Sequence, residues 1–401
     1  MGISILLGTT KGTFVVDGSD DRVGWRAKGP YCAGWAINHV IGDPETGMLW
    51  AGGGGDFFGA GVWRSEDGGE NWSLVRLTKG EMDGWAESEP DFARLMGWTG
   101  APLPFNADFS QIWSLHFADG VLYAGAKPAR LLKSRDMGLT WELVEGLTDH
   151  PSAKDWNPGA AGLVLHTIVT APTDPSRMWV GISAAGVFAT EDGGATWDRR
   201  NRLSNAEACS GHSHPASPSG GEVGHCVHNM MRAAGQADLL YQQNHHGVWR
   251  SSDGGRSWDD VTDGLPSTFG FPIRVHPRDP QTLWTLPLNG DMAGRFPPDA
   301  ACAVWRSRDG GGTWEAQRRG LPQDGCYFTV LRQAMAGDTR DPAGVYFGTN
   351  SGSVFGSIDE GESWHEVARH LPTILSVEVH ERIQGGQPPV LRTPPGIFSA
   401  R

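Results

Sequence analysis

The octapeptide SEDGGENW at residues 65–72 decides the fold of this chain, because five variants of it follow at intervals. The variants are SRDMGLTW, TEDGGATW, SSDGGRSW, SRDGGGTW and SIDEGESW, which end at Trp141, Trp197, Trp258, Trp314 and Trp364. Each copy reads S/T-x-D-x-G-x-S/T/N-W, and successive Asp residues lie 69, 56, 61, 56 and 50 positions apart. A repeat of this length indicates an array of small sheet units stacked around a shared core.

The residue types of these six copies, which we call Asp boxes, are those of a tight turn. We expect the Asp to accept hydrogen bonds from backbone N–H groups, the Gly to adopt a positive φ, and the Ser or Thr to close a local hydrogen bond. The Trp is expected to pack between neighbouring units. The box therefore predicts fold and carries little information about activity.

Composition supports a turn-rich, all-β protein with one domain. The 401 residues include 57 Gly, 26 Pro and 18 Trp, and the boxes run nearly from end to end. The five cysteines are widely spaced and odd in number, so no disulfide framework is expected. The sequence thus predicts a large core that is held together by packing.

The net charge of −13 argues against a nucleic acid or an acidic membrane surface as partner, since both need a basic face. The start, MGISILLGTTKG, has no charged region ahead of its short apolar run, and no stretch approaches 18 apolar residues. We therefore predict a cytoplasmic protein without nucleic-acid or membrane partners.

Each unit reads as four strands, with the box in the turn between the third and the fourth. The unit of the third box has the strands LVLHTIVTAP, RMWVGIS, GVFAT and TWDRR, and the next has HCVHNMM, LLYQQN, GVWRS and SWDDV. The other box-bearing units begin near Ala36, Gln111, Gly270 and Tyr327.

The remaining segments complete a ring. The opening ISILLGTTKGTFVV, with Trp25, supplies three strands, and TILSVEV after Leu371 supplies the fourth, which removes a sheet edge. We predict an all-β fold: a seven-bladed β-propeller of four-stranded blades with six Asp boxes, closed by N- and C-terminal strands that share one blade. The propeller would span residues 1–380, and residues 381–401 would form a C-terminal tail.

This layout resembles the bacterial-neuraminidase-repeat (Asp-box) β-propeller superfamily, which includes sialidases, the sortilin-type receptor propeller and a photosystem II assembly factor. Segments such as GVFATEDGGATW, YQQNHHGVWRSSDGG, FGFPIRVHPRDPQTLW and DPAGVYFGTNSG are similar to bacterial proteins that carry the names glycosyl hydrolase or exo-α-sialidase. The resemblance implies a sialidase-like propeller hydrolase. It also demands an F/Y-R-I-P motif ahead of the first box, which is absent, so the sequence argues against exo-sialidase activity.

Long insertions fall on one side of the predicted ring. They cover residues 73–110, 142–162, 198–224 and 287–303, all on the face opposite the boxes, which we call the long-loop face. Loops that exceed a tight turn on one face usually build a binding surface. His166 and His228 begin the innermost strands of adjacent units on this side, and His39 is displaced by one residue.

These histidines, with His245 and His246 in the turn between the second and third strands of the same unit as His228, predict a site at the channel mouth. The predicted catalytic residues are His166, His228 and His245. The predicted metal ligands are His39, His166, His228, His245 and His246, for a divalent Zn, Mn, Fe or Ni ion, with a metal-free site as the alternative. The loop CSGHSHP at 209–215 has ligand spacing, but its composition favours a plain loop.

Polar side chains at the same rim are candidates for substrate binding: Lys127, Arg130, Gln243, Arg274 and Arg332. Arginines can clamp a carboxylate with two parallel hydrogen bonds, and interblade ion pairs are their structural alternative. Histidines in strands are likewise often hydrogen-bonded core residues.

Two functional interpretations stay open. One is a hydrolase or lyase that acts on a small anionic or carbohydrate-like substrate at the histidine-rich mouth, with or without metal assistance. The other is a non-catalytic scaffold that binds a protein partner on the long-loop face. We favour the enzyme, because a tapering rim suits a small ligand.

Overall fold

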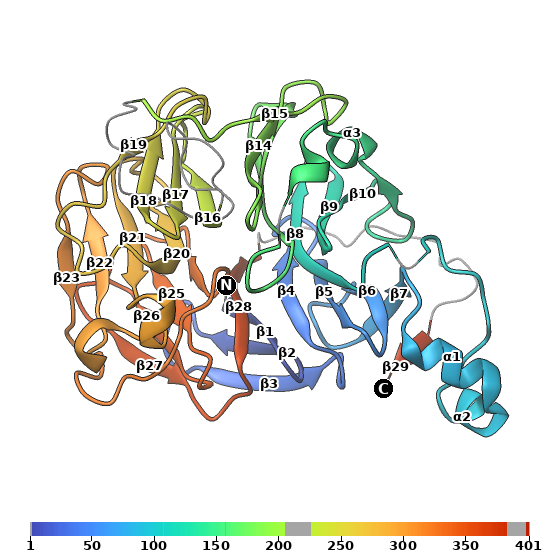
Figure 1. Ribbon diagram of the computed structural model, residues 1–401. Helices are drawn as coiled ribbons and strands as arrows, with labels where there is room; N and C mark the ends of the chain where they lie inside the picture. The colour runs from blue at the N-terminus through green and yellow to red at the C-terminus, as the bar shows by residue number, and fades with distance from the viewer. Residues whose placement is uncertain (1, 107, 157, 205–225, 383–397, 401) are drawn as a thin grey trace.

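The protein is mostly β, with a few short helices in its connections (Figure 1). The computed structural model describes residues 2–106, 108–156, 158–204, 226–382 and 398–400. Among these residues no helix is both long enough and apolar enough to cross a membrane.

Four-stranded groups follow one another along the chain. The first group pairs β1 (Ile3–Thr9), β2 (Gly12–Gly18) and β3 (Arg26–Tyr31) with β28 (Ile374–Glu381). The second is β4 (Ile37–Gly42), β5 (Leu49–Gly55), β6 (Gly59–Ser65) and β7 (Trp72–Arg76). The third is β8 (Gln111–Ala118), β9 (Val121–Lys127), β10 (Leu131–Ser134) and β11 (Glu142–Leu143), joined to the second through the β5–β8 pair.

The remaining groups each form a separate antiparallel sheet. The fourth is β12 (Leu165–Ala171), β13 (Asp174–Ile182), β14 (Gly186–Thr190) and β15 (Asp198–Arg199). The fifth is β16 (Val227–Arg232), β17 (Leu240–Asn244), β18 (Gly247–Ser251) and β19 (Asp259–Asp260). The sixth is β20 (Gly270–Val275), β21 (Leu283–Pro287), β22 (Val304–Ser307) and β23 (Glu315–Gln317). The last is β24 (Met335–Gly337), β25 (Val345–Gly348), β26 (Val354–Ser357) and β27 (His365–Ala368).

Helices occupy the long connections. Within the described residues they are α1 (Glu81–Ser88), α2 (Pro90–Leu95), α3 (Glu145–Thr148) and the 3-10 turns η1 (Ala153–Asp155), η3 (Asp291–Ala293) and η4 (Pro298–Ala300). Helices α1 and α2 project from the body of the protein beyond β7 (Figure 1). In the C-terminal tail, β29 (Phe398–Ala400) pairs with β7 at the edge of the second group.

The first strands of the groups lie side by side around a common axis. Each packs on the next in the order β4, β8, β12, β16, β20, β24 and β28, and β28 also contacts β4. The predicted pairing between the two ends of the chain is present, with Leu6 of β1 opposite Glu378 of β28. The strands are therefore arranged as in a β-propeller, with β28 bringing the C-terminal part of the chain into the N-terminal sheet.

One strand begins later than the sequence predicts. The last box-bearing unit was expected to begin near Tyr327, but β24 begins at Met335. The segment before it takes an irregular path along the inside of the ring, and its contacts there are described below. Local pattern could not separate this path from a strand, because the residues are apolar in both cases.

The Asp boxes form the expected turn. In the last copy, Asp359 accepts hydrogen bonds from the Ser357 hydroxyl (2.7 Å), the Ser363 backbone N–H (2.9 Å) and the Ser363 hydroxyl (2.5 Å). Gly361 has a φ of +95°, and Trp364 Nε1 donates to its carbonyl oxygen at 3.0 Å. The same bonds to Asp recur in the other copies, at Asp67, Asp136, Asp192, Asp253 and Asp309.

Buried tryptophans of the second strands join neighbouring sheets through these boxes. Trp50, Trp179 and Trp284 are almost completely buried, and each donates its indole N–H to a backbone carbonyl of the next box. The acceptors are Met137 O (2.9 Å), Gly254 O (2.8 Å) and Glu360 O (3.1 Å) respectively. A box therefore stabilises its own turn and also the contact with the preceding sheet.

Candidate functional site

Four successive innermost strands each carry a polar side chain near their start. Each of these side chains donates a hydrogen bond to a backbone carbonyl oxygen near the start of the next innermost strand. The four bonds are Asn38 Nδ2 to Ile112 O (2.9 Å), Ser114 Oγ to Leu165 O (2.9 Å), His166 Nε2 to Val227 O (2.9 Å) and His228 Nδ1 to Gly270 O (2.5 Å). The equivalent placement of His166 and His228 thus has a structural consequence, since both imidazoles tie adjacent sheets together.

His166 is committed to hydrogen bonds on both ring nitrogens. Its Nε2 faces Val227 O, and its Nδ1 lies 2.8 Å from the Thr167 hydroxyl oxygen. Burial, followed by the nearby Arg332 charge, holds the pKa of His166 well below its usual range, so the ring is neutral at pH 7. Both ring nitrogens of His166 therefore face protein oxygen atoms, and neither is directed at a position that His228 and His245 share.

His39, like His166, has a partner in the protein at each of its two ring nitrogens. Its Nδ1 accepts the Leu115 backbone N–H at 2.9 Å, and its Nε2 lies 3.2 Å from Glu378 Oε1. Glu378 belongs to β28, so this contact links the second sheet to the first. His39 is thus engaged in an inter-sheet contact with a carboxylate.

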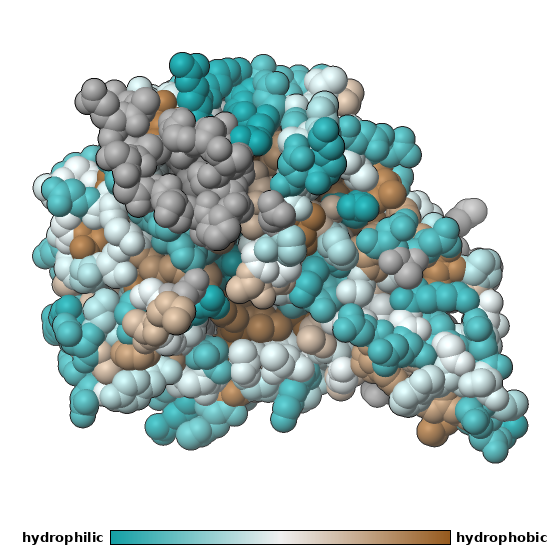
Figure 2. Space-filling model, viewed as in Figure 1, coloured by the Kyte–Doolittle hydropathy of each residue, from teal (hydrophilic) through white to brown (hydrophobic). Residues whose placement is uncertain are grey.

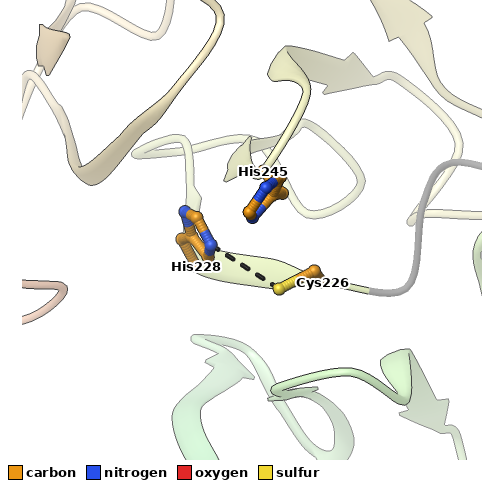
Figure 3. Close-up of side chains that lie close together, drawn as sticks. All are labelled: Cys226, His228 and His245. Atoms are coloured by element: carbon orange, nitrogen blue, oxygen red, sulfur yellow. Dashed lines mark hydrogen bonds between the residues drawn. The ribbon is translucent and has the colours of Figure 1, made fainter. Parts of the chain in front are cut away.

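Three side chains do converge at the start of β16 (Figure 3). Cys226, His228 and His245 each offer one ligand atom, and these atoms lie within 4.8 Å of one another. Cys226 Sγ is 3.6 Å from His228 Nε2, and the His228 and His245 ring centroids are 5.4 Å apart. The structure therefore brings together two of the predicted histidines, and it adds a cysteine that the prediction omitted.

The cluster is held in place by its own strand pair. His245 follows β17, and its backbone N–H donates to Cys226 O at 3.0 Å, which fixes the turn against the start of β16. Cys226 and His228 are separated by one residue, so they project from the same face of the chain as it enters the strand. That spacing was the available sequence signal for Cys226.

Aromatic rings and two arginines surround the cluster. The His228 ring lies 5.1 Å from Phe269 and 4.6 Å from Phe271. The guanidinium groups of Arg295 and Arg332 lie 5.8 Å and 4.9 Å from the Phe271 centroid. Burial and then Arg332 hold the pKa of His228 well below its usual range, so His228 is a neutral imidazole at pH 7.

The other predicted residues take different places. His246 lies beside His245, with ring centroids 4.9 Å apart. Lys127 sits over the Trp113 ring at 5.6 Å, and Arg130 donates to Ala129 O at 2.9 Å. The loop at 209–215 lies outside the described residues.

Two of the predicted substrate-binding residues are used inside the fold. Gln243 is 1% exposed, and its amide donates to the carbonyl oxygens of Asn244, Gly247 and Thr268. Arg274 donates to Gly337 O at 3.1 Å, and burial lowers its pKa. Of the five predicted substrate-binding residues, Arg332 is thus the one placed beside the cysteine–histidine cluster.

The segment ahead of β24 crosses the inside of the ring. Gln333 Nε2 donates to His166 O at 2.6 Å and to Trp113 O at 3.3 Å, and Asn229 Nδ2 donates to Arg332 O at 2.6 Å. Gln333 also bridges to Ser376 of β28. Residues 332 and 333 therefore contact strands from several sheets next to the cluster.

A line of aromatic rings marks a second feature of the long-loop face. Consecutive ring pairs are Trp35–Phe58 (5.1 Å), Phe57–Phe58 (4.9 Å), Phe57–Trp85 (5.5 Å) and Trp85–Phe92 (5.9 Å). Trp35 is buried next to β4, whereas Trp85 on α1 is 55% exposed. Apolar side chains are visible among polar ones at the corner formed by α1 and α2 (Figure 2).

Helix α1 is fastened to the turn that carries two of these rings. The Glu81 and Met82 backbone N–H groups donate to Asp56 O and Phe57 O, each at 2.9 Å. Asp83 pairs with Arg76 and accepts the Trp98 indole N–H at 2.9 Å. These bonds fix the insertion on the sheet, so the aromatic line has a rigid base.

Comparison with known proteins gives one family search without a match and a set of similar sequences and structures. No family model matches the chain. The chain is 26% identical over 334 residues to a xyloglucanase of Hypocrea jecorina, a match that covers 75% of this chain and 34% of that protein. The chain thus spans about a third of the length of this curated relative.

Solved structures agree on the architecture. A GH74 xyloglucanase from Xanthomonas campestris has a TM-score of 0.59 at 16% identity, over 92% of this chain and 53% of that one. YCF48 from Cyanidioschyzon merolae has a TM-score of 0.53 at 14% identity, over 84% of this chain and 86% of that one. With the four-stranded sheets described above, these likenesses define the chain as a β-propeller protein.

Proposed function

We propose that this protein is a carbohydrate-active β-propeller that binds a glycan chain on its long-loop face and hydrolyses it. The aromatic line that runs from Trp35 to Phe92 is the observation that carries this proposal. The apolar C–H faces of sugar rings stack on exposed aromatic rings, and Trp85, which is 55% exposed, offers such a ring in the outer part of the line, whereas Trp35 is buried at its inner end. The sequence similarity to a xyloglucanase supports the same substrate class.

The proposed fold underlying this site is a closed ring of seven blades with six Asp boxes. Its support is the order in which the innermost strands pack, which returns from β28 to β4. In that ring Trp35 directly precedes the innermost strand β4, and the line ends at Trp85 on α1 and Phe92 on α2, which project beyond β7 (Figure 1).

Two exposed carboxylates stand at the middle of the line. Asp56 precedes Phe57 in the β5–β6 turn, and Glu81 begins α1, with its N–H bonded to Asp56 O at 2.9 Å. Hydrolysis of a glycosidic bond uses a pair of carboxyl groups, one as acid and one as base or nucleophile. We assign the reaction to this pair within the proposal.

A second candidate is binding of a small anionic ligand at the cysteine–histidine cluster. Arg295 and Arg332 both lie over Phe271 beside His228, which favours a carboxylate or a similar group there. A metal-assisted hydrolase or lyase would use the cysteine–histidine cluster. A protein-binding scaffold would catalyse no reaction at the cluster or at the aromatic line.

The test is a panel of glycans with the full chain. Xyloglucan, cello-oligosaccharides, polygalacturonate and sialyllactose are incubated with the protein, with reducing ends measured for hydrolysis and calorimetry for binding. We expect binding and turnover of a neutral β-glucan, with turnover about 10²–10⁴-fold lower in Asp56→Asn. Trp85→Ala should weaken binding, and Val23→Ala, an exposed apolar side chain in the β2–β3 turn, is the matched control.

The other outcomes redirect the assignment. Turnover of polygalacturonate or sialyllactose that survives Trp85→Ala would place the reaction at the cysteine–histidine cluster. Absence of both binding and turnover across the panel would overturn the glycan proposal and favour the scaffold.

A further inference from the structure

The cysteine–histidine cluster has the separation of a metal site. In a tetrahedral zinc site, with Zn–S near 2.3 Å and Zn–N near 2.1 Å, adjacent S and N ligand atoms lie about 3.6 Å apart. Cys226 Sγ and His228 Nε2 are 3.6 Å apart. All three ligand atoms lie within 4.8 Å, so rotation of the His245 side chain is the adjustment that closure around an ion requires.

His228 is oriented as metal-bound histidines are. Its Nδ1 donates to Gly270 O at 2.5 Å, which places the proton on Nδ1 and leaves the Nε2 lone pair directed at Cys226. A histidine ligand usually donates its second ring N–H to a carbonyl or carboxylate, which fixes both its tautomer and its orientation. The acceptor belongs to the adjacent strand β20, so the orientation is built into the ring of sheets.

His245 is positioned by the backbone. The bond from its N–H to Cys226 O holds the two residues together at 3.0 Å, whatever the side chains do. The His245 ring also lies edge-on to Phe269, with centroids 5.0 Å apart. The backbone of the third ligand is therefore fixed by the turn, and the adjustment that an ion requires is confined to the His245 side chain.

On this basis we infer that Cys226, His228 and His245 form a binding site for a transition-metal ion of the zinc type. Within the described part of the chain these three side chains are the ligand set, which leaves a fourth tetrahedral position for a small ligand, as in catalytic zinc sites. This inference does not depend on the proposed glycan activity, because it concerns a different group of residues.

The surrounding charges define which ion suits the site. Arg295 and Arg332 oppose added positive charge, and a thiolate on Cys226 offsets one unit of it. A thiolate with two imidazoles selects soft or borderline ions such as Zn²⁺, whereas Mg²⁺, Ca²⁺ and Mn²⁺ prefer oxygen ligands. The two arginines would favour an anionic group at the fourth position.

Cobalt(II) is the spectroscopic probe for this site. The full-length protein, stripped with chelator and kept reduced, is titrated with Co²⁺, and thiolate-to-cobalt charge-transfer absorption is followed in the near ultraviolet. We expect one equivalent of Co²⁺ to produce this band, and Zn²⁺ to abolish it by displacement. Mg²⁺ should leave it unchanged.

Matched cysteine variants identify the ligand. Cys226→Ser should lose the charge-transfer band, because a hydroxyl is not a thiolate donor. Cys32→Ser alters another buried cysteine, which packs in a core cluster that contains neither Phe269 nor Phe271, and should keep the band. Circular dichroism of both variants shows whether each one folds.

A measurement on the unaltered protein covers the case in which a variant fails to fold. Alkylation of each cysteine by iodoacetamide is followed by peptide mass spectrometry with and without Zn²⁺. Protection of Cys226 by about one equivalent of Zn²⁺ supports the site. The inference is overturned if Co²⁺ gives no band and Zn²⁺ gives no protection; fast alkylation under those conditions would identify Cys226 and His228 as a metal-free thiol–imidazole pair.

Discussion

His228 Nδ1 donates to the carbonyl oxygen of Gly270 at 2.5 Å, and this one bond connects the fifth and sixth sheets while it orients the Nε2 of the same ring toward Cys226. His166 makes the corresponding inter-sheet bond to Val227 O one sheet earlier, but its second nitrogen is occupied by Thr167. Two histidines at equivalent positions therefore differ in the chemistry left to them. The Nε2 of His228 faces a cysteine thiol, whereas both ring nitrogens of His166 face oxygen atoms of the protein.

Replacement of His166 by Leu should destabilise the protein without affecting metal binding. The variant leaves the buried carbonyl oxygen of Val227 without its imidazole donor, a loss of about 1–3 kcal/mol in the free energy of unfolding. Urea unfolding measures this loss, with His365→Leu at an exposed position as control. An unchanged midpoint would show that the inter-sheet bond contributes nothing. Loss of the cobalt band in a folded His166→Leu protein would place His166 in the metal site.

Buried histidines should make the protein less stable in mild acid. Burial lowers the pKa of both His116 and His380 from 6.5 to about 4. The unfolded chain takes up these protons below pH 6.5, whereas the folded protein does so only near pH 4. The free energy of unfolding should therefore be greatest above pH 6.5 and fall as the pH decreases toward 4.

Urea unfolding at pH 7.5, 6 and 5 measures this dependence, and variants assign it. His116→Gln removes one of these buried titrating groups, so its free energy of unfolding should change less between pH 7.5 and 5 than that of the unaltered protein. His365→Gln, at an exposed position, should keep the full dependence. Equal slopes for all three proteins would contradict the assignment to His116.

The Asp of each box should contribute more to the free energy of unfolding than an ordinary surface carboxylate does. Asp253 accepts bonds from the Ser251 hydroxyl (2.8 Å), the Ser257 N–H (2.9 Å) and the Ser257 hydroxyl (2.6 Å). Burial alone would raise its pKa, but these bonds outweigh burial and lower it. Asp253→Ala should cost about 1–3 kcal/mol in the free energy of unfolding.

Asp263→Ala, at an exposed position a few residues beyond the same box, is the control and should cost less than about 0.5 kcal/mol. The stabilisation by Asp253 should be present above about pH 4 and lost as the pH falls through its lowered pKa. Equal costs for the two variants would show that the box turn does not depend on its carboxylate.

The turns and the positions of many strands could be predicted from the sequence, because local residue patterns determine them. The octapeptides place their own turns, and the strand on either side follows from apolar runs of the right length, as at β12 and β16. The pairing of β1 with β28 was also predictable. The N-terminal segment supplies three strands of a four-stranded unit, and the C-terminal segment supplies the one that is missing.

Long-range contacts explain what the sequence does not reveal. The irregular segment before Met335 is fixed by bonds to Trp113, His166 and Asn229, which are distant in sequence. Likewise, whether a histidine donates a hydrogen bond to a carbonyl oxygen of the next strand depends on where that strand begins. The spacing of two residues between Cys226 and His228 is a local signal in the sequence, but the approach of His245 to both depends on the strand pair of β16 and β17.

Gln333 provides the sharpest test of the segment that crosses the ring. Its side-chain amide donates to two carbonyl oxygens from different sheets, Trp113 O at 3.3 Å and His166 O at 2.6 Å. Gln333→Glu keeps the shape but turns the donor into a carboxylate that faces two acceptors. We expect a loss of about 1–3 kcal/mol in the free energy of unfolding at pH 7, larger than that of Gln333→Leu, which leaves the carbonyls unpaired without adding charge.

The pH dependence of this variant separates repulsion from packing. Below the pKa of the new carboxyl group, protonation restores an O–H donor, so the difference between Gln333→Glu and the unaltered protein should shrink as the pH falls from 7 toward 4. Gln281→Glu makes the same chemical change at an exposed position and should show no such recovery. If Gln333→Glu equals the unaltered protein at pH 7, the amide does not hold the two strands, and the segment must be fixed by the Asn229 bond to Arg332 O instead.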